Sequence, residues 1–327
     1  MKALVTGGTG FIGSQVVKQL LDENHTVRIF SRKKDIPEIF KDRGVDVFQG
    51  DLENVQSLIN ALDGMDVFYH IGEIKNTSRA SSEKNVRLAE ETIRHLEEKK
   101  IKRIVFVSSI TVSGIPSALP ANEDTAPRII LSDHYTSYKM RCEKLIMSNA
   151  GDVEYVIIRP ALVYGPGSRY LGRLIDILDK FGSVGIPFAG NAKNIAPLIY
   201  VRDLAQAICR AGMEPSAAGQ IFIVTDGLRH SWFDFFNAIT EGLGKKLRII
   251  PIPPLFLQIA ALPLDIFSGF LGSSLDPVSY ITYFSQDLYF DNTRAKDLLN
   301  WQPSYSLSEG VKDMIGFYKK NSKGGPL

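Results

Sequence analysis

The stretch Lys2-Ala-Leu-Val-Thr-Gly-Gly-Thr-Gly-Phe-Ile-Gly13 decides how the chain folds. Its apolar start predicts a buried parallel strand, and the apolar spacing after it predicts an amphipathic helix. Between the two, Gly7 permits a tight turn, Gly10 lets a pyrophosphate approach the backbone, and Gly13 lets the helix pack closely on the strand. A tight turn without a ligand is the alternative, but strand, glycines and helix in this order favour a dinucleotide site at the helix N-terminus.

Composition and charge narrow the class of protein. The 327 residues are 44% hydrophobic and 23% charged with a net charge of +2, which is typical of a globular protein with room for two lobes. This charge gives no argument for a nucleic-acid partner. The two cysteines, Cys142 and Cys209, fall in helical patterns and predict reduced core thiols in a cytoplasmic protein. The chain begins with a core strand, so we expect no signal peptide, and no metal site is predicted.

Strand and helix patterns alternate through the first half of the chain. Apolar runs predict further strands at residues 27–30, 45–48, 67–70, 104–107 and 155–158. Helical patterns lie between them, for example at residues 55–62 and 85–99. This alternation predicts an α/β fold with a Rossmann-type, doubly wound parallel sheet, whose ligand lies beyond the carboxyl ends of the strands.

The pattern changes in the second half. A helix is expected at residues 170–181, a loop at 182–197, a strand at 198–201, a helix at 205–212 and a strand at 220–224. The rest is mostly helical up to Tyr318, and residues 321–327 predict a frayed tail. We expect a nucleotide-binding domain over residues 1–164, to which 197–226 return. A smaller, mostly helical substrate-binding lobe is expected from residues 165–196 and 227–327.

One apolar stretch, residues 249–271, has the hydrophobicity of a membrane span but contains four prolines and Asp265. Prolines at that density break a spanning helix. We expect a buried helical segment near an apolar substrate site, and contact with a membrane surface is the less favoured alternative.

The residues after the second strand indicate which dinucleotide binds. Folds that take NAD usually place an acid there for the ribose 2′-hydroxyl, whereas this chain has Ser31-Arg32-Lys33-Lys34. Because Arg32 attracts a 2′-phosphate, NADP(H) is favoured over NAD(H), with a solvated basic loop as the alternative. After the third strand, Asp51 beside Leu52 either accepts a hydrogen bond from adenine or caps the next helix. After the fourth strand come Ile71 and Gly72, and a missing side chain there can admit the ribose side of the cofactor.

Three residues predict acid–base chemistry. Tyr135 and Lys139 stand four apart, which on a helix places both on one face. The lysine charge is expected to lower the tyrosine pKa, so that Tyr135 can exchange a proton with a substrate oxygen. Ser109 follows a strand, where its hydroxyl can polarise a carbonyl. A solvated helix face is the alternative; Tyr138 lies off this face, and His134 is expected to be a loop or cap residue.

In order along the chain, these motifs resemble the extended short-chain dehydrogenase/reductase family, also called the NAD-dependent epimerase/dehydratase family. The resemblance rests on Thr6-Gly-Gly-Thr-Gly-Phe-Ile-Gly13, Gly50-Asp-Leu52, Val107-Ser-Ser-Ile-Thr-Val-Ser-Gly114, Tyr135 to Lys139, Arg159-Pro-Ala-Leu-Val-Tyr-Gly-Pro-Gly167, Tyr200-Val-Arg-Asp-Leu204 and Phe290-Asp-Asn-Thr-Arg-Ala-Lys-Asp-Leu-Leu-Asn-Trp-Gln-Pro303. It implies a catalytic triad of Ser109, Tyr135 and Lys139, with Lys139 also on the nicotinamide ribose. It further implies a homodimer through the helices after the fourth and fifth strands.

The resemblance also implies which residues surround the ligands. Those expected at the cofactor are Gly7, Thr9, Gly10, Phe11 and Ile12 at the pyrophosphate, and Pro160 to Val163 at the nicotinamide. Those expected at the substrate are Ile110, Thr111 and Tyr164.

Departures from the family pattern bear on the substrate. Sugar-nucleotide enzymes of the family often carry an arginine where this chain has Ala196-Pro197, and Glu73 replaces a usual small residue. The proline-rich stretch after Ile249 looks more like the 3β-hydroxysteroid dehydrogenase and dihydroflavonol reductase branch. We therefore expect hydride transfer between NADP(H) and an apolar ketone or secondary alcohol. The alternatives are a sugar-nucleotide epimerase, reductase or dehydratase, and a non-catalytic dinucleotide sensor, although a sensor typically loses the tyrosine.

Overall fold

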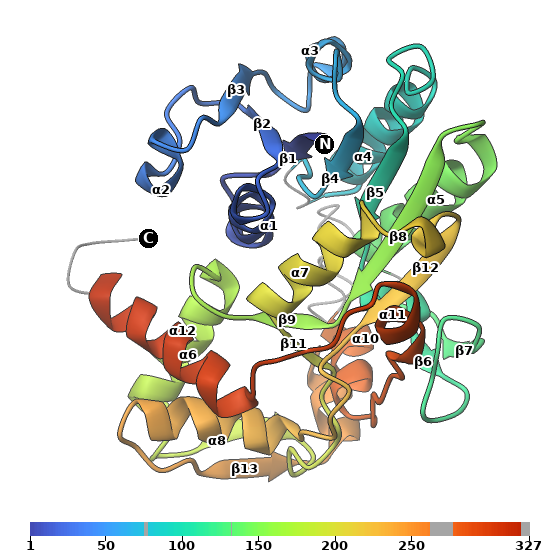
Figure 1. Cartoon of the computed structure of the whole chain (residues 1–327). Helices are drawn as coiled ribbons and strands as arrows, with labels where there is room; N and C mark the ends of the chain where they lie inside the picture. Colours follow the sequence, from blue (N-terminus) through green and yellow to red (C-terminus); the bar gives the residue numbers. More distant parts are fainter. Residues whose placement is uncertain (75–77, 132, 262–276, 322–327) are drawn as a thin grey trace.

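The computed structural model describes residues 1–74, 78–131, 133–261 and 277–321. Its centre is a parallel sheet with the strand order β12-β8-β5-β4-β1-β2-β3 (Figure 1). The strands are β1 (Lys2–Thr6), β2 (Thr26–Ser31), β3 (Asp46–Gln49), β4 (Val67–His70), β5 (Arg103–Val107), β8 (Glu154–Pro160) and β12 (Gln220–Val224). The prediction of a doubly wound parallel sheet is confirmed.

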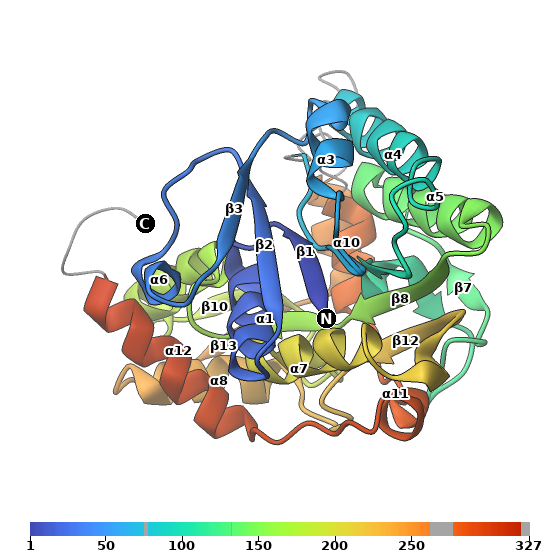
Figure 2. The ribbon, with the colours of Figure 1, turned by 45° about the horizontal axis from the view of Figure 1, so that its top comes forward.

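Helices cover both faces of the sheet, and alternate residues of β1 show why (Figure 2). Ala3 and Val5 pack in one apolar cluster with α1 (Phe11–Asp22) and α7 (Val201–Ala211). Leu4 points the other way, into a cluster with α3 (Val55–Ala61), α4 (Arg79–Ile93) and α5 (His134–Asn149). The period of two along a strand thus gives a sheet buried on both sides.

A second group of elements adjoins the carboxyl end of the sheet. Its core combines aromatic and aliphatic side chains and is built on α6 (Arg169–Phe181), α8 (Trp232–Gly242) and α12 (Leu307–Asn321). Two short parallel pairs complete it: β9 (Leu162–Tyr164) with β11 (Leu198–Tyr200), and β10 (Ile186–Ala189) with β13 (Ile249–Ile252). The remaining elements are α2 (Glu38–Lys41), η1 (Ile110–Ser113), β6 (Ile115–Pro116), β7 (Pro127–Ile129), η2 (Pro215–Ala217), α10 (Pro277–Phe284) and α11 (Thr293–Leu298).

The structure corrects several expected boundaries. Helix α4 begins at Arg79 rather than at residue 85, because the Ser78 side chain accepts a hydrogen bond from the Ser81 amide and caps it. Helix α7 begins at Val201, directly after β11. The loop expected over residues 182–197 contains strand β10, which pairs with β13.

The buried helix expected over residues 249–271 is observed only in part, because residues 254–261 are helical but largely exposed. The stretch opens with strand β13, since Pro251 suits extended backbone in a two-stranded pair. The helical residues that follow expose Leu255, Phe256 and Ile259 by 64, 68 and 56%. Residues 262–271 and 322–327 lie outside the described part of the chain. Within the described ranges, no helix is long and apolar enough to cross a membrane. Cys142 and Cys209 are buried and free, as predicted.

Candidate active site

The glycine turn after β1 leaves room that side chains would fill. Gly7 has φ +69°, and a Cβ there would lie 2.8 Å from the Cα of Gly72 in the segment after β4. A Cβ on Gly13 would lie 2.1 Å from the Gly7 carbonyl oxygen. Among the described residues, no side chain caps α1, whose N-cap residue is Gly10. The first amides of α1, including those of Phe11 and Ile12, therefore face an uncovered end that suits an anion.

The segments after β2 and β3 lie beside each other because the two strands pair in parallel. The Ser31 hydroxyl accepts a hydrogen bond from the Lys33 amide at 3.2 Å. In the described structure the exposed Arg32 guanidinium makes no hydrogen bond or ion pair. The Asp51 carboxylate accepts from the Glu53 amide at 3.1 Å, whereas Asn54 is the N-cap of α3. Asp51 is therefore not the cap of that helix, and Leu52 packs against the core.

Tyr135, Lys139 and Ser109 come together at the carboxyl end of β5. Asp133 caps α5 by accepting from the Thr136 amide at 2.9 Å, which places Tyr135 in the first turn. The Lys139 ammonium donates to the Val107 carbonyl at 2.8 Å and lies 5.7 Å from the centre of the Tyr135 ring. Ser109 is buried just past the strand, where its hydroxyl accepts from Thr111 Oγ1 at 3.0 Å.

The structure does not bear out the expectation that Lys139 lowers the pKa of Tyr135. The pKa of Tyr135 is raised, first because burial disfavours the charged phenolate and then because the negative charge of Glu73 repels it. A hydrogen bond with Ser109 acts in the opposite direction and does not outweigh them. The prediction of a lowered pKa is therefore wrong for this arrangement of charges.

Glu73 is the residue at this site to which sequence reasoning gave no role. Its carboxylate oxygen Oε2 accepts a hydrogen bond from the Tyr138 hydroxyl and lies 3.6 Å from the Lys139 ammonium. Tyr138, which the helix spacing sets off the catalytic face, thus contacts the site through Glu73. The available signal was an acidic residue directly after Gly72.

A buried ion pair supports the end of β5. Arg159 on β8 contacts the Glu143 carboxylate on α5 at 2.6 Å, and Ser108 donates to the same carboxylate. Because Ser108 precedes Ser109, this pair holds the backbone that carries the Ser109 hydroxyl. The sequence motifs did not indicate it.

The other residues expected at the cofactor or the substrate differ in how exposed they are. Pro160 ends β8, Val163 is partly buried on β9, and Thr9 and Thr111 are at least partly exposed. Tyr164 is only 1% exposed and packs on Tyr200 and Phe235 in the core of the second group of elements, so the structure does not bring it to a substrate. Ile110 is likewise buried in an apolar cluster.

The sequence matches the family model described as the NAD dependent epimerase/dehydratase family over residues 3–224. The chain belongs to this family. It is therefore an NAD-dependent enzyme of the extended short-chain dehydrogenase/reductase type. The glycine cradle fits this assignment, because Gly7, Gly13 and Gly72 leave space where any side chain would collide with backbone.

Relatives within the epimerase/dehydratase family differ in reaction. The chain is 28% identical to UDP-glucose 4-epimerase of Vibrio cholerae, covering 98% of this chain and 96% of that protein. It is 24% identical to 3 beta-hydroxysteroid dehydrogenase/Delta 5-->4-isomerase of Mycobacterium tuberculosis, covering 97 and 90%. The solved structure of MoeE5 in complex with UDP-glucuronic acid and NAD has the same fold, with a TM-score of 0.75 at 19% identity over 98 and 100% of the chains.

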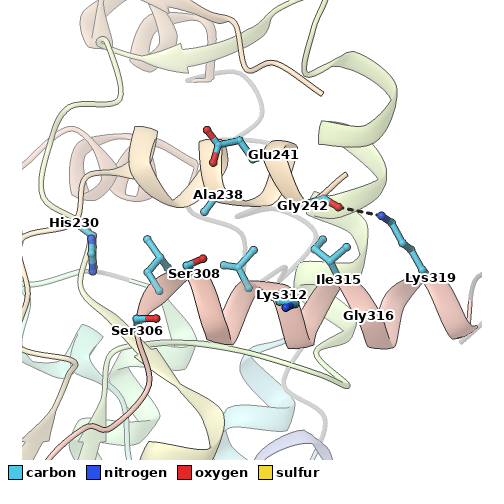
Figure 3. Close-up of a pocket in the computed structure, with 12 residues that line it drawn as sticks. His230, Ala238, Glu241, Gly242, Ser306, Ser308, Lys312, Ile315, Gly316 and Lys319 are labelled. Atoms are coloured by element: carbon cyan, nitrogen blue, oxygen red, sulfur yellow. Dashed lines mark hydrogen bonds between the residues drawn. The ribbon is translucent and has the colours of Figure 1, made fainter. Parts of the chain in front are cut away.

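A separate pocket of about 640 Å³ lies between α8 and α12 (Figure 3). Its apolar lining includes Ala238, Leu307, Val311 and Ile315, and Lys319 donates to the Gly242 carbonyl at one end at 2.9 Å. It contains none of the predicted family site residues.

Proposed function

We propose that this chain is an NADP(H)-dependent oxidoreductase that interconverts an apolar ketone and the corresponding secondary alcohol. The observation that carries the proposal is the convergence of Ser109, Tyr135 and Lys139 at the end of β5 in the same sheet as the glycine cradle. At the carboxyl end of a parallel sheet, such residues face the position where ligands bind.

Each residue has a distinct task in the proposed reaction. The nicotinamide supplies or accepts the hydride when it is bound. Tyr135 gives its phenolic proton to the substrate oxygen in reduction and takes it back in oxidation. Ser109 donates a hydrogen bond to that oxygen and orients it. Lys139, anchored on the Val107 carbonyl, supplies positive charge beside the Tyr135 ring.

The preference for NADP(H) rests on the segment after β2. It carries Arg32 with an exposed guanidinium and has no carboxylate at Ser31 to repel a 2′-phosphate. A guanidinium can bind a phosphate with two parallel hydrogen bonds. This supports a role for Arg32 in selecting the phosphorylated dinucleotide.

The apolar character of the substrate is supported by the segment before β11. Ala196 is buried there and its amide donates to the His230 carbonyl, so the position where sugar-nucleotide enzymes of the family often carry an arginine offers no cation to a diphosphate. Similarity to a hydroxysteroid dehydrogenase points the same way. The second candidate, a sugar-nucleotide epimerase, is favoured by the 28% identity to UDP-glucose 4-epimerase.

The two candidates are separated by net redox change. Purified protein is incubated with NADPH or NADH and a panel of hydrophobic ketones, and separately with sugar nucleotides whose products are analysed. We expect consumption of NADPH with a hydrophobic ketone. Conversion of a sugar nucleotide to its epimer without net consumption would establish the second candidate, because an epimerase returns its hydride.

We also propose a homodimer through α4 and α5, which lie side by side on one face of the sheet (Figure 2). Met147 on α5 is exposed in the single chain, which supports an apolar contribution to such an interface. Sedimentation of the wild type and of Met147→Glu tests this: we expect a dimer that the added charge weakens. A monomeric wild type would contradict it.

A further inference from the structure

A carboxylate adjoins two of the three catalytic residues. Glu73 lies in the segment after β4, and its Oε2 is 3.6 Å from the Lys139 ammonium while accepting the Tyr138 hydroxyl. The Glu73 side chain is 37% exposed, whereas the Lys139 side chain is only 6% exposed. Glu73 is therefore the solvent-accessible partner of a buried ammonium.

The charges that face Tyr135 come from several elements. Helix α5 contributes Lys139 and Asp133, the segment after β4 contributes Glu73, and β5 contributes no charge but is followed by the Ser109 hydroxyl. On β4, burial lowers the pKa of His70 to about 3, so that ring is neutral at physiological pH. Glu73 is thus the carboxylate near the Lys139 ammonium, and its charge opposes the phenolate that the ammonium favours.

We propose that Glu73 is a positioning residue that offsets the charge of Lys139 and thereby keeps Tyr135 in its neutral phenol form, which biases the enzyme toward carbonyl reduction. The inference rests on the proposed function. In reduction the carbonyl carbon gains the hydride and its oxygen gains the Tyr135 proton, and the phenolate left behind is reprotonated from water. Oxidation reverses these bonds and needs the phenolate at the start, which Glu73 disfavours.

The geometry allows the charge of Glu73 to be separated from its hydrogen bond. Glu73→Gln keeps the size and the acceptor oxygen but removes the charge. Tyr138→Phe removes the hydrogen bond, keeps the carboxylate, and preserves the ring that meets Tyr135 edge-on at 5.5 Å. Glu83→Gln is a matched control, because Glu83 is an exposed carboxylate on α4 that pairs with Arg141.

The first readout is the phenolate of Tyr135 in the protein without added ligand. The phenolate is measured by ultraviolet absorbance as the pH is raised. The spectrum of each variant is compared with that of the same variant carrying Tyr135→Phe, and the difference belongs to Tyr135. The titration is restricted to the alkaline range in which circular dichroism shows an intact fold. We expect Glu73→Gln to form the phenolate at lower pH than the wild type, and Glu83→Gln to match the wild type. An unchanged titration in Glu73→Gln would overturn the proposal; Glu73→Ala repeats the test if Glu73→Gln does not fold.

The second readout is the pH profile of kcat/KM for alcohol oxidation. We expect the rising limb of Glu73→Gln to move to lower pH, so that its oxidation rate at a fixed pH on that limb increases roughly three- to tenfold. Tyr138→Phe, which keeps the charge, is expected to hold the wild-type profile. If no alcohol or ketone is turned over but the absorbance still shifts, the proposed function fails and the electrostatic role of Glu73 stands. If an alcohol or ketone is turned over but Glu73→Gln shifts neither the absorbance titration nor the pH profile, the role of Glu73 is wrong and the proposed function stands.

Discussion

A Cβ atom added to Gly72 would lie 2.7 Å from the backbone nitrogen of Gly7. The two glycines belong to segments far apart in the sequence, and they meet because β1 and β4 pair in parallel and end together. The Thr6 hydroxyl reinforces the contact by accepting the Ile71 and Gly72 amides at 3.1 Å. The close approach of the two backbones shapes the end of the sheet where the pyrophosphate is expected.

Gly72→Ala is therefore expected to displace the turn at Gly7 and to weaken dinucleotide binding at least tenfold, with a lower Tm. The measurement is titration of cofactor binding together with thermal unfolding. Gly316→Ala is the control, because a Cβ at this exposed position of α12 meets no atom of the described residues within 4 Å. That change is expected to leave binding unchanged and to stabilise the protein by about 0.5–1 kcal/mol. Equal affinities of Gly72→Ala and the wild type for the dinucleotide would contradict the close approach of the two backbones.

Arg32→Ala is expected to weaken NADPH binding by roughly 10- to 100-fold and NADH binding little, since a charge-assisted hydrogen bond contributes about 1.5–3 kcal/mol. Both dissociation constants are measured by the same titration. Arg94→Ala controls for the change in net charge, because Arg94 is an exposed cation at the C-cap of α4. Equal losses of affinity for NADPH and NADH would show that Arg32 does not recognise a 2′-phosphate.

The sequence alone predicted the strands of the sheet, but it did not predict how the charged groups at the site act on Tyr135. The strand at residues 67–70 was predicted because four apolar or aromatic residues in a row suit a strand covered on both faces. The meeting of Tyr138 with Glu73 was not, because a helix wheel compares residues of one element and Glu73 comes from another. The same limit explains the error on the Tyr135 pKa. It was argued from Lys139 alone, and the opposing burial and carboxylate appear only once the elements are packed.

Strand β13 shows a second limit of sequence patterns. An apolar run with prolines fits either a broken helix or an edge strand. The choice depends on β10, a short partner that was itself hidden in a Gly- and Pro-rich segment. Short strands that are stabilised by one another leave little periodicity to detect.

Glu143→Ala is expected to destabilise the protein by about 3–5 kcal/mol, because it leaves the mostly buried Arg159 side chain, which is 13% exposed, without its carboxylate partner. Activity is expected to fall as well, since the pair holds the backbone before Ser109. Urea unfolding measures the first effect. Glu83→Ala removes an exposed carboxylate from its pair with Arg141 and is expected to cost at most about 1 kcal/mol. Similar losses in the two variants would show that the buried pair contributes no more than the exposed one.

Asp226 gives a prediction for pH. Burial raises the pKa of Asp226 to about 7, while the carboxyl of an unfolded chain titrates near about 4. The folded protein therefore keeps this proton up to a higher pH than the unfolded chain does. The stability that the protonated Asp226 contributes is full at low pH and is lost as the pH rises from about 4 through 7. Asp226→Asn mimics the protonated side chain. It is expected to be more stable than the wild type at pH 8, by on the order of 2–4 kcal/mol, and equal to it near pH 4.

The measurement is Tm across pH for the wild type, Asp226→Asn and Asp297→Asn, whose carboxylate is exposed on α11. Only Asp226→Asn is expected to flatten the loss of stability between about pH 4 and pH 7. A curve for Asp226→Asn that runs parallel to that of the wild type would contradict a protonated, buried Asp226.

The central claim is that Tyr135 exchanges the proton in a redox reaction of an apolar ketone. The most direct test is NADPH consumption with a hydrophobic ketone by the wild type and by Tyr135→Phe, with cofactor binding measured on both. We expect kcat/KM to fall by about 10²- to 10⁴-fold in the variant while the affinity for NADPH is retained. Full activity in Tyr135→Phe, or a wild type that binds NADPH and consumes none with any ketone, would contradict the claim.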